Sequence, residues 1–101
     1  MIVRITYLSF LPEKIDEAKK IYHNELAPVV KRQPGNFDCR LLEPVDISDD
    51  YISMTVWDNE EDADAYQASG IYKELVDKVR ALYSENPVLK VYTTEKVMET
   101  A

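Results

Sequence analysis

The side chain best suited to acid–base chemistry in this sequence is His23, the one histidine of the chain. Its unperturbed pKa lies near neutrality, so an imidazole in a cleft could act as a general base. A single histidine excludes a metal site of paired imidazoles, and we expect no metal centre. His23 also fits a half-exposed residue on the flank of a helix, with no chemical role. We treat it as a candidate catalytic residue.

Tyrosines form the second candidate group, with seven in a short chain. Tyr22, Tyr66 and Tyr72 fall on predicted inward faces of helices, where their hydroxyls could orient a phenolic or quinone-like substrate. Trp57 could line the same cleft and stack on a planar ligand. We take Tyr66 and Tyr72 as candidate catalytic residues, and Tyr22 and Trp57 as candidate substrate-binding residues. Core packing is the alternative for each.

Arg40 is the remaining candidate for substrate binding. A strand arginine could hold an anionic substrate oxygen, or it could pair with Asp38 at the surface, and we favour the ion pair. Its neighbour Cys39 has no nearby histidine to activate it, and we expect a small buried apolar side chain.

Motifs for metal and phosphate binding are missing from the sequence. A calcium loop that begins at Asp46 would need Gly at its sixth position and Glu at its twelfth, where Tyr51 and Trp57 stand. The two glycines, Gly35 and Gly70, are too far apart to form a phosphate-binding loop. The acidic residues between positions 43 and 64 are explained by a solvated loop and a helix N-terminus.

Composition narrows the possible partners. A net charge of −7 over 101 residues argues against nucleic acid and against an anionic membrane surface. The single cysteine cannot form an internal disulfide, which fits a reducing compartment, and we expect a cytoplasmic protein. We expect no signal peptide, because the N-terminus lacks a basic region followed by a clean apolar run and a small-residue cleavage site. We expect no membrane span, because no apolar run approaches about 20 residues.

The first half of the chain has the elements that would position these residues. Residues 2–10 alternate as a strand with one apolar and one mixed side. Apolar spacing predicts a long helix over residues 14–32, which Pro28 should kink or restart. A second strand is predicted over residues 36–42, after a Pro-Gly turn.

The second half begins with a strand over residues 52–57 that turns directly into an acidic helix. Asp58 is predicted to cap this helix, and Glu61 completes a capping box. A further helix follows over residues 71–83. The last strand, residues 88–97, is apolar on both sides, which is typical of a strand covered on both faces.

The element order β-α-β-β-α-α-β predicts a ferredoxin-like α+β fold with an antiparallel four-stranded sheet. We expect one domain over residues 1–101. Helices would cover one face of the sheet, and the apolar character of the strands predicts that a second copy covers the other. We therefore expect a homodimer that forms through the sheet face.

Three stretches resemble the antibiotic biosynthesis monooxygenase family, namely LAPVV at residues 26–30, QPGNF at 33–37 and MTVWDNEEDA at 54–63. The resemblance implies a dimeric α+β barrel in which each protomer holds a cleft between sheet and helices. Activities of the family include cofactor-independent oxygenation of aromatic polyketides, quinol oxidation and haem degradation.

The haem-degrading branch of this family can be tested on three positions. It requires an Asn on the first strand, a Trp on the second helix and a His ten residues after that Trp. The first strand has no Asn, and Tyr66 and Val76 occupy the other two positions. The resemblance therefore implies no haem chemistry, and we expect no bound cofactor.

The sequence leaves three hypotheses for function. The first is a cofactor-independent monooxygenase that acts on a small aromatic or quinol-like molecule. The second is a non-catalytic dimeric module that binds a small apolar metabolite. The third is an isomerase on the same scaffold.

Overall fold

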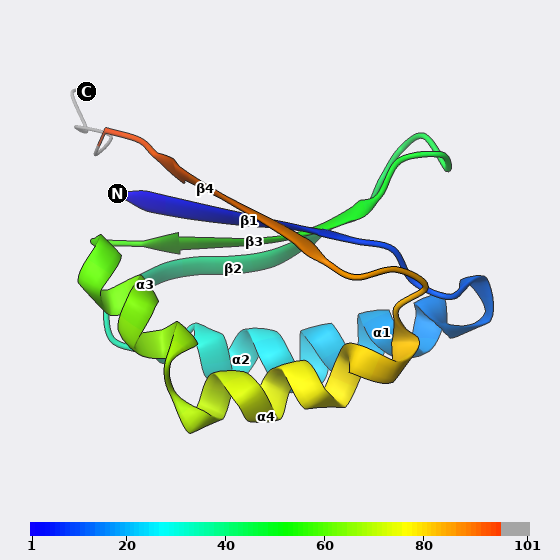
Figure 1. Cartoon of the computed structure of the whole chain (residues 1–101), viewed down its shortest axis with the longest axis horizontal. Helices are drawn as coiled ribbons and strands as arrows, with labels where there is room; N and C mark the ends of the chain where they lie inside the picture. The colour runs from blue at the N-terminus through cyan, green and yellow to red at the C-terminus, as the bar shows by residue number, and fades with distance from the viewer. Residues whose placement is uncertain (96–101) are drawn as a thin grey trace.

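A computed structural model describes residues 1–95, in which a four-stranded sheet lies on a layer of helices (Figure 1). The strands lie in the order β2-β3-β1-β4, and each neighbouring pair is antiparallel. The predicted ferredoxin-like α+β fold is confirmed. The strands are β1 (Ile2–Leu8), β2 (Asn36–Leu42), β3 (Tyr51–Trp57) and β4 (Val88–Thr93).

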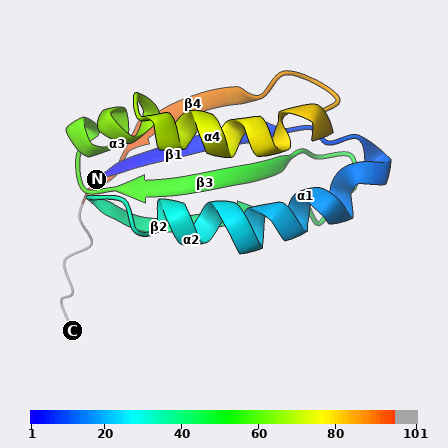
Figure 2. The same cartoon turned by 90° about the horizontal axis from the view of Figure 1, so that it is seen from below.

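The helices all lie on the same face of the sheet. Figure 2 shows α1 and α2 along the β2 side, with α3 and α4 along the β1 and β4 side. The helices are α1 (Ile15–Ile21), α2 (Ala27–Val30), α3 (Glu60–Gln67) and α4 (Gly70–Val79). Short 3₁₀ turns, η1 (Pro12–Lys14) and η3 (Arg80–Leu82), precede α1 and follow α4. No described helix is long and apolar enough to cross a membrane.

The long helix predicted over residues 14–32 contains a wide π-helical segment, η2 (Tyr22–Leu26), between α1 and α2. The N–H of Ala27 donates to the carbonyl of Tyr22, five residues back. Pro28 follows immediately and has no N–H to donate. The helix was predicted to kink or restart at Pro28. Its departure from regular α-helical geometry lies instead in the wide turn just before the proline.

The cap of α3 differs from the prediction by one residue. The side chain of Asn59, not that of Asp58, accepts a hydrogen bond from the backbone N–H of Asp62 at 2.9 Å. Asp58 instead donates its own N–H to the carbonyl of Gly35 at 2.8 Å. This bond ties the end of β3 to the turn that precedes β2. The helix begins at Glu60 as a result.

The two sides of β1 face different surroundings. Its mixed side, which includes Arg4 and Leu8, faces the helices, and both residues are buried. Its apolar side, with Val3, Ile5 and Tyr7, lies on the face of the sheet that no helix covers. The register pairs these three residues with Val56, Met54 and Ile52 of β3.

Both edge strands depart from the predicted pattern. All residues of β4 are exposed in the protomer, although a strand covered on both faces was predicted. It ends at Thr93, and the predicted continuation to residue 97 runs past the described residues. In β2 a bulge between Asn36 and Asp38 leaves the side chain of Phe37 61% exposed. The first strand ends at Leu8, and Phe10 forms a separate bridge with Tyr83.

Candidate functional site

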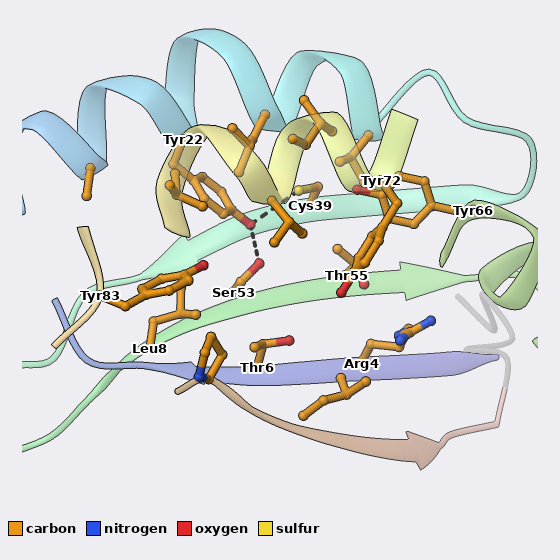
Figure 3. Close-up of a pocket in the computed structure, with 18 of the residues that line it drawn as sticks. Arg4, Thr6, Leu8, Tyr22, Cys39, Ser53, Thr55, Tyr66, Tyr72 and Tyr83 are labelled. Carbon is orange, nitrogen blue, oxygen red and sulfur yellow. Dashed lines mark hydrogen bonds between the residues drawn. The ribbon is translucent and has the colours of Figure 1, made fainter. Parts of the chain in front are cut away.

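A cavity of about 140 Å³ lies between the sheet and the helices (Figure 3). Strands β1 and β3 form its floor, and α1, η2 and α4 form its roof. The lining is mainly apolar, with Leu75, Val76 and Val79 supplied by α4. Its polar lining residues are Arg4, Thr6, Tyr22, Cys39, Ser53, Thr55, Tyr66, Tyr72 and Tyr83.

Tyr22 reaches from η2 to the floor of the cavity. Its hydroxyl shares a hydrogen bond of 2.7 Å with Oγ of Ser53 and lies 3.3 Å from Sγ of Cys39. The predicted inward position of Tyr22 is confirmed, and Cys39 is buried as expected. Burial raises the pKa of Tyr22 far above its usual range and also raises the pKa of Cys39. Both groups are therefore neutral near pH 7.

Tyr66 and Tyr72 form an aromatic corner at one end of the cavity. Their ring centroids are 5.3 Å apart in an edge-to-face arrangement. Tyr66 also stacks on Trp57, with centroids 5.1 Å apart. Trp57 is fully buried and donates its indole N–H to Thr55 at 2.9 Å. It supports Tyr66 from behind, so its predicted place as a cleft wall is taken by Tyr66.

Several hydroxyls in the cavity have no protein partner. Among residues 1–95, those of Thr6, Tyr66, Tyr72 and Tyr83 form no hydrogen bond. Burial raises the pKa of Tyr66 above its usual range, and burial raises that of Tyr83 to about 12. These phenols can donate hydrogen bonds to a bound molecule but are poor bases near neutral pH.

Arg4 places a positive charge in the wall of the cavity. Its side chain extends from β1, and the residue is 8% exposed. The guanidinium donates to the carbonyl of Ala63 at 3.3 Å and to the side-chain oxygen of Gln67. Both acceptors are neutral, and no carboxylate within residues 1–95 pairs with Arg4.

Two predicted site residues lie away from the cavity. His23 is exposed on the outer side of the helix layer, beside Asp16 and Lys20, because it follows the inward-facing Tyr22. Arg40 lies on the uncovered face of the sheet, because side chains alternate along β2 and Cys39 faces the helices. Its Nε is 2.7 Å from the carboxylate of Asp38, which is the ion pair that the sequence favoured.

Sequence reasoning missed Arg4, Thr6, Ser53, Thr55 and Tyr83 as cavity residues. The available signal was the mixed side of the first strand, where Arg4 and Thr6 alternate with apolar residues. A mixed side is ordinarily read as the solvent side of a half-buried strand. In this fold it faces a cavity that contains polar groups.

The donors around the cavity do not fit a haem or a metal ion. Val76 lines the wall at the position where the haem-degrading branch has its histidine, and no described lining residue is a histidine or a carboxylate. Over residues 1–95, no cluster of three or more His, Cys, Asp and Glu side chains could hold a metal ion. A larger depression of about 580 Å³ lies at the β2–β3 loop, where Val45 and Ile47 are fully open to solvent. The inner cavity has the converging polar groups typical of a binding site.

The fold and the cavity define a ferredoxin-like α+β protein with a tyrosine-lined pocket between sheet and helices. The family model for antibiotic biosynthesis monooxygenase matches residues 1–78. The chain belongs to the antibiotic biosynthesis monooxygenase family. A search of curated proteins finds no significant match.

Solved structures share the fold at low sequence identity. A protein of Nitrosomonas europaea described by the same family name is 24% identical, with a TM-score of 0.79 over 93% of this chain and 98% of that one. A variant of SnoaB, a cofactor-independent oxygenase from Streptomyces nogalater, is 17% identical, with a TM-score of 0.79 over 97% and 96%. A variant of MhuD with two manganese protoporphyrin IX molecules per active site is 23% identical, with a TM-score of 0.76 over 100% and 99%.

Proposed function

We propose that this protein is a cofactor-independent monooxygenase that acts on a small aromatic or quinol-like substrate. The observation that carries the proposal is the cavity between sheet and helices, in which the hydroxyls of Tyr66 and Tyr72 have no hydrogen-bond partner among residues 1–95. Membership in the antibiotic biosynthesis monooxygenase family supports it. The similarity to SnoaB adds support at the level of fold.

The substrate itself would supply the electrons in this reaction. Its phenolate or enolate form transfers an electron to O₂, and the two radicals combine to a peroxide that then releases water. One oxygen atom enters the product, the other leaves as water, and the substrate loses two hydrogens. The protein then has to orient the substrate and stabilise its anion.

Tyr66 and Tyr72 are the residues best placed for orientation. Their hydroxyls can donate to a substrate oxygen, and the Trp57 ring behind Tyr66 fixes its position. Tyr22 is already engaged with Ser53, so in this proposal it shapes the floor. His23 and Arg40 do not line the cavity, and their predicted roles in catalysis and substrate binding remain to be tested.

A non-catalytic binding module is the second candidate. It is favoured by one observation, namely that no described lining residue has a carboxylate or an imidazole that could act as a base. Such a module would hold an aromatic metabolite in the same cavity without turnover.

We also propose that the uncovered sheet face pairs with a second copy of the chain. The face carries Val3, Ile5, Met54 and Val56 at its centre, and the exposed strand β4 continues it at one edge. A second sheet packed on this face would form the dimeric α+β barrel that the family resemblance implies. A cytoplasmic location remains a prediction from the single cysteine.

Oxygen uptake during aerobic incubation with a panel of one-ring quinols tests the monooxygenase, and three-ring anthrones serve as the control for substrate size. We expect uptake above buffer and a product heavier by one oxygen and lighter by two hydrogens. Tyr72→Phe should lower turnover roughly tenfold, in line with the loss of one orienting hydrogen bond. His23→Ala, which changes a residue outside the cavity, should leave turnover unchanged. Binding without oxygen uptake would identify the binding module instead.

A further inference from the structure

The charge of Arg4 is the feature of the cavity that the proposed function leaves unexplained. An arginine remains protonated in proteins, so this buried side chain retains its positive charge. Two of its donors bond to neutral oxygens, those of Ala63 and Gln67. A buried charge without an opposite charge has an unfavourable desolvation free energy, and an anion bound beside it would offset that cost.

The groups around Arg4 form one polar end of the cavity. Thr55 lies opposite Arg4 in the β1–β3 register, and both residues line the cavity together with Tyr66 and Tyr72 (Figure 3). The positive charge of Arg4 acts on Tyr66 and partly opposes the rise in its pKa that burial causes. The titratable groups that line the cavity are Arg4, Tyr22, Cys39, Tyr66, Tyr72 and Tyr83. No described lining residue is anionic near pH 7, so a negative charge at this end has to come from a ligand.

The volume of the cavity limits the size of this ligand. An apolar cavity of about 150 Å³ is sufficient to bind benzene. The cavity here has nearly the same volume, about 140 Å³, and the apolar side chains of Leu75, Val76 and Val79 line its roof. It therefore matches one aromatic ring and is far smaller than a porphyrin requires.

We propose that the cavity binds a planar molecule of one-ring size that has an anionic oxygen, and that Arg4 binds this oxygen. The inference rests on the proposed function, because it names the class of substrate for the same site. Both a phenolate or enolate and a carboxylate present this chemistry. Arg4 would hold either one by a charge-assisted hydrogen bond while Tyr66 and Tyr72 donate to it. For a phenol, the same contact favours the anion, which is the form that reacts with O₂.

The test uses 4-nitrophenol, whose phenolate absorbs at a longer wavelength than the neutral phenol, and 4-nitrotoluene as its uncharged counterpart. We expect the bound phenol to ionise at lower pH than the free dye, and the phenolate to bind more tightly than 4-nitrotoluene. Benzoate against benzamide forms the carboxylate arm. Binding of one anion identifies the source of the oxygen, and binding of both supports the shared chemistry. If neither anion binds more tightly than its neutral counterpart, the proposal is overturned.

Two arginine variants separate the role of Arg4 from that of charge in general. Arg4→Met should weaken phenolate binding about 10- to 100-fold, the range for hydrogen bonds to charged groups, and leave 4-nitrotoluene binding nearly unchanged. Arg32→Met removes the same charge from the exposed turn after α2, outside the cavity, and should have no effect. Equal losses in both variants would contradict the proposal. If Arg4→Met does not fold, Arg4→Lys and the wild-type preference for the anion decide the question.

The outcomes also separate this inference from the proposed function. Tight phenolate binding that depends on Arg4, without oxygen uptake on any substrate, would remove the monooxygenase and leave the inference standing. Oxygen uptake that is unchanged in Arg4→Met would support the monooxygenase and contradict the role of Arg4 in binding the anion.

Discussion

The hydroxyl of Tyr22 lies 2.7 Å from Oγ of Ser53, and this contact joins η2 to the middle of β3. It crosses the cavity floor and connects the helix layer to the sheet by one hydrogen bond. The thiol of Cys39 lies 3.3 Å from the same hydroxyl. The position of η2 over the sheet therefore depends on a polar contact within an otherwise apolar layer.

Tyr22→Phe should lower the free energy of unfolding by about 0.5–1.5 kcal/mol, since Ser53 then loses its partner. Tyr72→Phe is the matched control, because its hydroxyl has no partner among the described residues, and we expect little change. Chemical denaturation of both variants measures the difference. If Tyr22→Phe, Ser53→Ala and the double variant show additive effects, the two side chains are not coupled.

Gly35 and Gly70 should respond in opposite ways to alanine. Gly35 has a φ of +78°, and a Cβ there would lie 2.1 Å from a carboxylate oxygen of Asp62. Gly35→Ala should therefore be destabilising by about 1–3 kcal/mol. Gly70 begins α4 and has open space around it, so Gly70→Ala should be neutral or stabilising by up to about 1 kcal/mol. Thermal unfolding compares the two, and equal effects would refute the assignment of strain to Gly35.

Alkaline pH should unfold the protein through its buried phenols. The folded-state pKa values of Tyr22, Tyr66 and Tyr83 are raised by burial, to about 12 for Tyr83. Their contribution to stability is thus fully present below the unfolded value of about 10 and is lost as pH rises above it. We expect phenolate absorbance from these residues to appear together with loss of circular dichroism. Ionisation of all tyrosines at the pH of free tyrosine, with the fold intact, would be inconsistent with their burial.

Met54→Lys should prevent dimerisation. Met54 pairs with Ile5 of β1 and Arg40 of β2 near the middle of the uncovered face, so a lysine there would have to be desolvated in a sheet-to-sheet interface. Sedimentation equilibrium should give a dimer for the wild type at micromolar concentration and a single chain for the variant. Ile71→Lys, on the partly exposed surface of α4, is the control and should remain dimeric. A wild-type protein that sediments as one chain would contradict the proposed dimeric barrel.

The fold was predictable because periodicity, caps and turns agree along the chain. The predicted helix cap was wrong by one residue, because two neighbouring side chains can both accept the capping hydrogen bond. Both Asp58 and Asn59 are good caps, and the choice depends on pairing of Trp57 with Ile2, which keeps β3 extended to its last residue. The bulge at Phe37 likewise depends on how β2 meets β3.

The site was predictable for the tyrosines and not for Arg4. Tyr22, Tyr66 and Tyr72 lie on apolar helix faces, where helical spacing alone directs them inward. For a strand, spacing separates two sides but does not say which side meets the helices. The chain contains Arg4 and Arg40 in similar alternating contexts, yet one lies in the cavity and the other on the opposite face. Only the tertiary arrangement distinguishes them.

The wide turn at Tyr22–Leu26 has a consequence for how this site can change. This turn closes its hydrogen bond five residues back and so holds one residue more than an α-helical turn. Removal of one residue from it would restore regular pitch and leave the faces that α1 and α2 turn toward the sheet unchanged. Only the side chains of the turn itself would then change direction relative to the cavity, and Tyr22 lies at its first position. The length of this turn thus determines which of its side chains faces the cavity. Single-residue insertions or deletions here would change the lining of the cavity and leave the sheet unchanged.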